Sequence, residues 1–418
     1  MILEIRLSNF FSIKDEIVLD LRAGNIKTQK SKALKHNIFG FEKTEVLKTV
    51  ALYGANASGK SNIIKAIRFC NSMVFKSHQH NENIIFNFQS FKFNNYQKKP
   101  SSYFVRFVSN NIEYEYSFSL SQVEIITESL YYYPKGKRAK IFTREEKPGK
   151  TKKEIYSFST VIKRPMDVAE NTSRKTLYIS RASQMDRLIP KEIFRYFHEK
   201  FILGYKGLNN LPLELLFNEN KELLLQALKM ADSDIIDIKI IKELQKGKNI
   251  KADFHSSTVS VEDIEKAHLR IITHHKNSPK IAFDFNTEES AGTKKLFFIM
   301  LTIIDIVKNN KVLLIDEIED SLHTNIIEYI IEVFNASDKA QLIYSTHNTK
   351  LLNLNKLRKD QIFFVNKKED ASTDLYSLYD YKDFRETMDV EKAYLQGRFD
   401  AVPFVDDSIE NLKSIING

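Results

Sequence analysis

A glycine-rich segment before residue 62 carries the residues that phosphate binding requires. It matches G-x-x-x-x-G-K-[ST] at every position, with Gly54, Ala55, Asn56, Ala57, Ser58, Gly59, Lys60 and Ser61. In such a loop the backbone N–H groups surround the phosphates, the lysine contacts the outer phosphates and the hydroxyl binds Mg²⁺. Residues 50–53 precede it like a buried strand, and the residues from Asn62 onward follow it like a helix. We therefore expect residues 54–62 to bind ATP, with Lys60 also acting in catalysis and Ser61 holding Mg²⁺. The alternative is a chance match in a turn.

A second group of reactive side chains follows the apolar run 312–315. Asp316 and Glu317 come directly after this run, which reads as a buried strand. Ligands of an α/β sheet gather at the carboxyl ends of its parallel strands, so both carboxylates are expected beside the phosphate loop. There Asp316 would hold Mg²⁺ through water and Glu317 would polarise the attacking water. The alternative is a solvated strand end.

Two more segments fit the same chemistry. His347 ends the apolar run 340–346, one helix after the carboxylates, and is expected to reach the γ-phosphate or the attacking water. A capping or core histidine is the alternative. Ser290 and Gly292 open a helix with an apolar stripe, where backbone donors and the helix dipole favour a second phosphate group. The same pattern also occurs in ordinary helix caps.

The order of these motifs resembles that of ABC-type ATPases of the SMC and recombination class. Residues 290–293 are similar to the signature motif of that class, Ser321-Leu322-His323 to its D-loop and His347 to its switch histidine. The resemblance implies that two copies of the chain enclose two ATP molecules, each signature facing the phosphate loop of the other copy. It therefore implies a homodimer or a larger homo-oligomer gated by ATP.

The chain is similar in more detail to bacterial AAA family ATPases of the abortive-infection type, the RloA/AbiLi-like group, which are relatives of the OLD nucleases. The shared motifs are Ile5-x-Leu7-x-Asn9-Phe10-x-Ser12, the phosphate loop, Glu289-Ser290-x-Gly292-Thr293, Asp316-Glu317-Ile318-Glu319-x-x-Leu322-His323, Ser345-Thr346-His347-Asn348 and Tyr394-Leu395-Gln396-Gly397-Arg398-Phe399. One departure is Thr324, where the family often has proline. The resemblance implies an ATP-hydrolysing sensor or regulatory subunit of an anti-phage system.

The effector of such a system is expected on another chain. Only about seventy residues follow His347, too few for the Toprim nuclease of OLD proteins. A separate nuclease or toxin, for example a Toprim or RloB-like nuclease, is therefore the expected partner.

Two other functions stay open. One is a RecF/SMC-like DNA-repair ATPase, favoured by the strand pattern of the N-terminus and a net charge of +9. Nine basic residues between Lys135 and Lys153 fit a hairpin that binds nucleic acid, although a solvated loop is the preferred interpretation. The other is a scaffold that binds ATP and barely hydrolyses it.

The chain is long enough for two or three domains, at 418 residues. Alternating aromatic and β-branched residues over 84–180 predict an antiparallel sheet, and strands and helices alternate after 281. We expect an α/β, P-loop ABC-type ATPase with an antiparallel β subdomain and a helical insertion lobe. The expected divisions are an N-terminal ATPase lobe (1–185), a helical insertion lobe (186–275) and a C-terminal ATPase lobe (276–418).

The composition indicates a cytoplasmic protein. No apolar run is long enough to cross a membrane, and the N-terminus lacks the build of a signal peptide. The single cysteine, Cys70, cannot form an internal disulfide, which fits a reducing compartment. We expect Cys70 to belong to the core.

Overall fold

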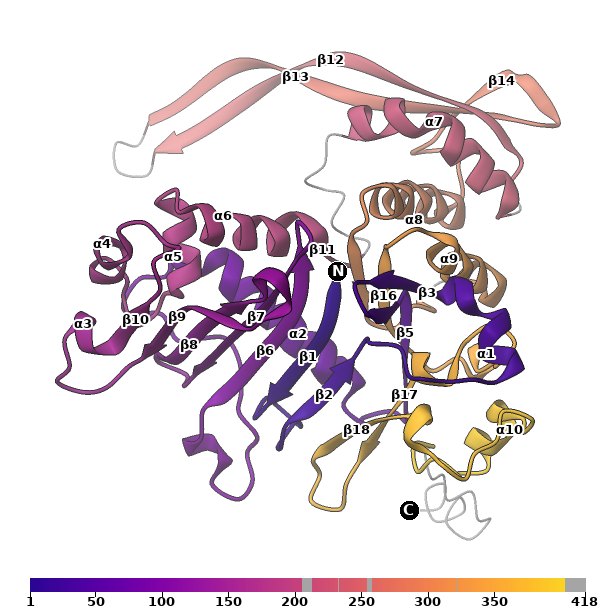
Figure 1. The fold of residues 1–418 in the computed structure, drawn as a ribbon. Coiled ribbons are helices and arrows are strands. Elements are labelled where there is room, and N and C mark those ends of the chain that lie inside the picture. Colours follow the sequence, from indigo (N-terminus) through magenta and orange to yellow (C-terminus); the bar gives the residue numbers. More distant parts are fainter. Residues whose placement is uncertain (205–212, 232, 254–257, 321, 403–418) are drawn as a thin grey trace, which may run out of the picture. The chain divides into compact units, whose positions relative to one another are not determined.

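The structure is a computed structural model that describes residues 1–204, 213–231, 233–253, 258–320 and 322–402. Its contacts divide the chain into two compact units, Met1–Gly204 with Asn309–Gly418, and Tyr205–Lys308 (Figure 1). This division differs from the three consecutive segments expected from the sequence. The ends of the chain share one unit because strands from both ends pair in a common sheet.

That sheet has six strands and carries the phosphate loop. Its inner strand β5 (Thr49–Tyr53) is buried along its whole length, as inner parallel strands are. The spatial order is β11 (Phe201–Leu203), β15 (Val312–Ile315), β16 (Gln341–Thr346), β5, β17 (Ile362–Lys367) and β18 (Thr373–Ser377). All neighbouring pairs are parallel except β17 and β18. The predicted α/β class is confirmed, and β5, β15 and β16 end at the same edge.

The second sheet of this unit is antiparallel and has seven strands. In spatial order these are β10 (Tyr156–Phe158), β9 (Ala139–Glu145), β8 (Ile125–Tyr132), β7 (Ile112–Leu120), β6 (Ser101–Ser109), β1 (Ile2–Ser8) and β2 (Ile17–Asp20). Asn110 and Asn111 join β6 to β7, and both have positive φ. Two-residue hairpin turns favour asparagine and glycine for this reason. The expected antiparallel sheet is confirmed. A small sheet pairs β3 (Ile38–Phe41) with β4 (Thr44–Leu47).

Helix α2 (Lys60–Lys76) packs against both large sheets. Its buried Ile63 and Ile67 belong to the same core as Leu7 of β1 and Leu52 of β5. Cys70 is buried in this core, as expected. The other α-helices described in this unit are α1 (Gln29–Ala33), α3 (Lys152–Ile155), α4 (Pro165–Glu170), α5 (Tyr178–Gln184), α6 (Leu188–Arg195), α9 (Thr324–Ala336) and α10 (Val390–Leu395). Among the described residues, no helix has the length and apolar character needed to span a membrane.

The described part of the second unit contains two helices and a long β-ribbon. The elements are α7 (Leu213–Met230), β12 (Ile235–Asp253), β13 (Thr258–His275), β14 (Ser278–Asp284) and α8 (Ala291–Lys308). Helix α7 agrees with the helical lobe expected over 186–275. The helical lobe expected over 186–275 is wrong for 235–275, which forms the antiparallel pair β12–β13. Isoleucines at 236, 238 and 240 alternate with other residues, a period that favours a strand.

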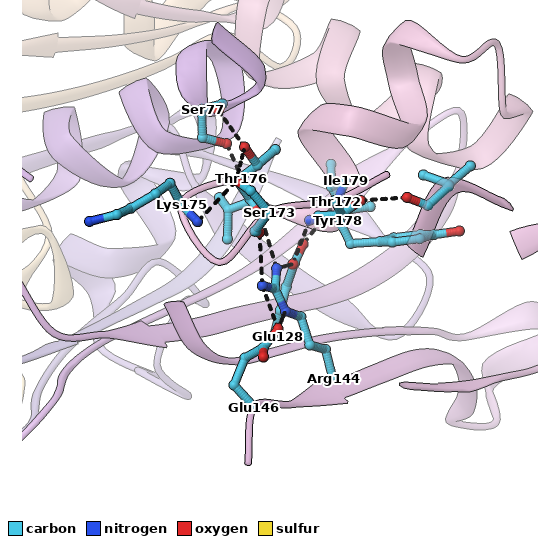
Figure 2. A network of polar contacts seen from close by, with 12 residues as sticks. Ser77, Glu128, Arg144, Glu146, Thr172, Ser173, Lys175, Thr176, Tyr178 and Ile179 are labelled. Carbon is cyan, nitrogen blue, oxygen red and sulfur yellow. Dashed lines mark hydrogen bonds and ion pairs between the residues drawn. The ribbon is translucent and has the colours of Figure 1, made fainter. Parts of the chain in front are cut away.

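A buried ion pair fastens the antiparallel sheet to the end of α2 (Figure 2). Glu128 and Arg144 lie 3.6 Å apart, and both side chains are fully buried. Glu128 accepts the backbone N–H of Tyr178 at 2.6 Å, and Arg144 donates to the carbonyl of Thr176 at 2.7 Å. The hydroxyl of Thr176 in turn donates to the carbonyl of Ser77, directly after α2. The helix that starts at the phosphate loop is thus anchored at both ends.

We expect Arg144→Met to lower the free energy of unfolding by about 3–5 kcal/mol, because it leaves the Glu128 carboxylate buried without its cation. The matched control is Arg138→Met, since Arg138 pairs with Glu115 at 2.6 Å from a half-exposed position. Its cost should stay below about 1 kcal/mol. Urea unfolding of both variants measures the difference, and equal losses would contradict the assigned role of the network.

Candidate nucleotide-binding site

The phosphate loop lies at the carboxyl end of β5 and leads into α2, as predicted. Two of its glycines are required by close packing. A Cβ on Gly54 would overlap the carbonyl oxygen of Val365, and one on Gly59 would overlap the hydroxyl of Thr373. Gly59 also has φ +112°, a backbone conformation that residues other than glycine rarely adopt. The loop therefore fits tightly onto β17 and β18.

Lys60 is buried inside the loop. Its Nζ donates to the carbonyls of Gly54 at 2.7 Å and Ala55 at 3.0 Å, and lies 3.5 Å from Nδ1 of His347. Burial lowers the pKa of Lys60 to about 8, although Glu317 and other nearby carboxylates act in the opposite direction. Burial removes water from the Lys60 ammonium and makes it less stable. A phosphate placed beside Lys60 would therefore attract the ammonium strongly and restore its stability.

Asp316 follows β15 and lies beside the start of α2. The hydroxyl of Ser61 is 3.3 Å from Oδ1 of Asp316, and Ser345 donates to the same oxygen at 2.6 Å. A hydroxyl and a carboxylate are oxygen ligands of the kind that Mg²⁺ prefers. Among the described residues, no group of three or more His, Cys, Asp and Glu could hold a metal by itself. The pair fits Mg²⁺ whose other ligands are phosphate and water oxygens.

Glu317 is exposed and lies two residues after the end of β15. Its φ is +53°, which is uncommon for a residue other than glycine, and its N–H donates to Oγ of Ser345 at 2.8 Å. Strained backbone of this kind is concentrated at functional sites. Ser345 thus holds the carboxylate of Asp316 and the backbone of Glu317, a role for which the sequence carries no local signal.

His347 directly follows β16 and lies beside Lys60. Burial and the Lys60 cation lower the pKa of the His347 imidazole. The backbone N–H of His347 donates to a carboxylate oxygen of Glu319. The lowered pKa favours the neutral imidazole at pH 7. Glu319, to which the sequence assigned no role, fixes the backbone at the end of β16. Lys60, Ser61, Asp316, Glu317 and His347 are brought together as predicted.

A polar chain from distant parts of the sequence supports the loop. Asn62 donates to Oγ of Ser12 at 2.7 Å, Ser12 lies 2.7 Å from the hydroxyl of Thr373, and Thr373 donates to the carbonyl of Ser58 at 3.1 Å. Asn62, expected among the nucleotide-binding residues, here uses its side chain for support. The role of Thr373 carries no local sequence signal, because it depends on the pairing of β17 with β18.

Ser290 and Gly292, the residues similar to the signature motif, belong to the second unit, whereas the phosphate loop belongs to the first. The Oγ of Ser290 accepts the N–H of Thr293 at 3.0 Å and so caps α8. Ser290 and Gly292 are both exposed, and a Cβ on Gly292 would meet only the side chain of Ser290. The start of α8 therefore presents free backbone donors on the surface of its unit, together with the positive end of the helix dipole.

The D-loop-like segment is partly described. Ser321 lies outside the described residues, and His323 caps α9 by accepting the N–H of Asn325. Thr324 stands where the family often has proline, and its hydroxyl accepts the side-chain amide of Asn348 at 2.8 Å. This departure therefore adds a bond between α9 and the residue that follows His347.

The basic segment from Lys135 to Lys153 offers less free charge than its composition suggests. Within it, Arg138, Arg144, Lys147, Lys150 and Lys152 pair with carboxylates. These contacts count against a hairpin whose cations are free for nucleic acid. The preferred solvated loop is wrong for Ala139–Glu145, which forms β9 and carries the fully buried Arg144.

Comparisons with known proteins agree with this site. A family model described as "AAA domain, putative AbiEii toxin, Type IV TA system" matches residues 50–353, which include the phosphate loop, Asp316, Glu317 and His347. No curated protein matches the chain.

Several solved structures of SMC heads are similar to the chain. An SMC head bound to the C-winged helix domain of ScpA is 14% identical over 94% of this chain and 99% of that chain, with a TM-score of 0.45. The SMC head domain from Thermotoga maritima is 12% identical over 90% of this chain and 98% of that chain, with a TM-score of 0.40. An Smc head with an extended coiled coil, bound to the C-terminal domain of ScpA derived from Pyrococcus furiosus, is 14% identical over 95% of this chain and 98% of that chain, with a TM-score of 0.39. Likeness at this level carries no argument about function.

Proposed function

The chain belongs to the AAA domain family whose model spans residues 50–353, and on that premise we propose that it is an ATP-hydrolysing regulatory subunit of a bacterial anti-phage, abortive-infection system. In this proposal ATP joins two or more copies of the chain, and the assembly controls a separate nuclease or toxin. The observation that carries the ATPase part is the convergence of Lys60, Ser61, Asp316, Glu317 and His347 at the ends of adjacent parallel strands. The buried, unpaired Cys70 supports a cytoplasmic location.

The proposed mechanism assigns each side chain one task. Lys60 leaves the carbonyls of Gly54 and Ala55 and donates to the outer phosphates of ATP. Ser61 and Asp316 would hold Mg²⁺, which neutralises charge on the phosphates. Glu317, oriented through Ser345, accepts a proton from the attacking water. Neutral His347 contacts the water or the γ-phosphate.

The second half of the site is assigned to another copy of the chain. The exposed backbone donors at Ser290 and Gly292 suit the γ-phosphate of an ATP held by a partner's phosphate loop. This assignment makes hydrolysis depend on assembly.

We expect Gly292→Asp to lower ATP turnover by about 100-fold or more, because the new carboxylate repels phosphate at the start of α8 and removes transition-state stabilisation. The affinity of a single, unassembled copy of the variant for ATP should stay unchanged, because Gly292 is not in the unit that holds the phosphate loop. Steady-state turnover and calorimetric binding measure the two quantities. Wild-type turnover in this variant would refute the composite site.

We also expect ATP binding to take up protons near pH 8. Lys60, with a pKa of about 8, is about half protonated there, and bound phosphates raise its pKa. Uptake should therefore be about half a proton per ATP at pH 8 and nearly none at pH 6. Calorimetry in two buffers of different ionisation enthalpy measures it. The control is Lys60→Arg, whose guanidinium stays charged. Equal uptake by both proteins would contradict the assignment.

The second candidate function is a RecF/SMC-like DNA-repair ATPase, supported by the net charge of +9. It predicts ATP turnover that duplex DNA stimulates at low salt, with strong salt dependence. Turnover measured with and without DNA separates the two proposals. An unchanged rate at low salt counts against DNA repair and leaves the regulatory proposal in place.

A further inference from the structure

An aromatic and basic cavity lies on the outer face of α2, apart from the phosphate loop. It has a volume of about 510 Å³, and none of residues 54–61 lines it. One wall is a face of α2 with Lys65, Arg68 and Phe69, spaced three and four residues apart as on one side of a helix. The other walls come from the turn after β1, through Phe11, and from the segment after α2, through Ile85. We call this cavity the α2 pocket.

The positive charges of the α2 pocket have no counter-charge in the part of the chain that the structure describes. Lys65 Nζ lies 5.9 Å from the ring centroid of Phe11, and neither Lys65 nor Arg68 forms an ion pair with a described residue. Nε of Arg68 is buried without a hydrogen-bond partner. Among the described lining residues there is no carboxylate, and the titratable side chains are Lys65, Arg68 and His80.

The apolar part of the pocket is open to a partner. Ile85 is 68% exposed, whereas Phe10 and Phe86 beneath it are buried. Most of the lining is therefore aromatic or aliphatic, with cations beside it. Such a combination suits an apolar side chain that carries negative charge next to it.

We propose that the α2 pocket is a docking site for a partner protein, which inserts an aromatic or aliphatic side chain flanked by carboxylates. Charge complementarity selects the acidic flanks, because no described carboxylate pairs with Lys65 or Arg68. A nucleic-acid strand fits less well. It needs a series of open ring faces and a track of cations, whereas Phe10 and Phe86 are buried and the pocket is a single hollow.

The test uses anilinonaphthalene sulfonate, a fluorescent aromatic anion, without any nucleotide bound. We expect the wild type to bind the dye, and Arg68→Glu to reduce bound fluorescence at least about fivefold. The matched control is Lys76→Glu, the same change of charge at the exposed end of α2, which should bind like the wild type. Ile85→Asp, at an exposed position, gives the same loss and keeps the test valid if Arg68→Glu does not fold.

Competition then identifies the chemical class. A short peptide with one phenylalanine between aspartates and glutamates should displace the dye, and its alanine version should not. Equal dye binding by all variants would overturn the proposal. So would displacement by oligothymidine or AMP instead of the peptide, or displacement by none of these competitors. Because no ATP turnover enters the measurement, its outcome is independent of the proposed ATPase function.

Discussion

Replacing Glu317 with glutamine should lower ATP turnover by about 10²–10⁴-fold while ATP still binds. The amide cannot accept a proton from the attacking water, and general-base catalysis contributes a factor of this size. The side chain keeps its shape, so the bond from the Glu317 N–H to Ser345 should persist. Single-turnover kinetics and calorimetric binding measure the two effects.

The matched control for that variant is Glu45→Gln, which makes the same change at an exposed position of β4. Its turnover should equal that of the wild type. If Glu317→Gln also keeps wild-type turnover, Glu317 is not the base. If neither the wild type nor Glu317→Gln hydrolyses ATP above the background rate, the chain is a scaffold that binds ATP and barely hydrolyses it.

Replacing Lys60 with alanine should weaken ATP binding by about 2–5 kcal/mol, a factor of about thirty to several thousand. Loss of one partner from a close charge pair with phosphate has a cost of this order. Lys60 also bonds to Gly54 and Ala55, so the loop itself loses two contacts. The control is Lys76→Ala at the exposed end of the same helix.

Fluorescence anisotropy of a labelled ATP analogue measures both lysine variants. Lys76→Ala should bind like the wild type. Unchanged affinity in Lys60→Ala would show that the triphosphate does not reach the loop. Equal weakening in both variants would point to a general effect of charge rather than a specific contact.

The sequence predicts that Asp316 and His347 lie near the phosphate loop, because each follows a buried strand. Asp316 and His347 come after β15 and β16, and the geometry of a parallel sheet alone places them near Lys60. The supporting residues are less predictable. Ser12 and Thr373 meet at 2.7 Å although 361 positions separate them, and no local pattern announces this contact.

The prediction for the insertion fails for a different reason. The helical lobe predicted over 186–275 is confirmed for Leu213–Met230, which forms α7, but not for the isoleucines that follow. These β-branched residues alternate, and their backbone pairs with β13 instead. The Ser-x-Gly pattern predicts the start of α8, whereas its contact with the phosphate loop of a second copy is part of the proposed function.

We propose that ATP drives assembly, and the mass of Glu317→Gln in solution tests this proposal most directly. Light scattering is recorded for this variant with Mg²⁺ alone and with Mg²⁺ and ATP, at one protein concentration. We expect the mass of one chain without ATP and a twofold or higher multiple with it, because slow turnover keeps the composite site closed. The same mass under both conditions, with ATP binding confirmed by calorimetry, would contradict it.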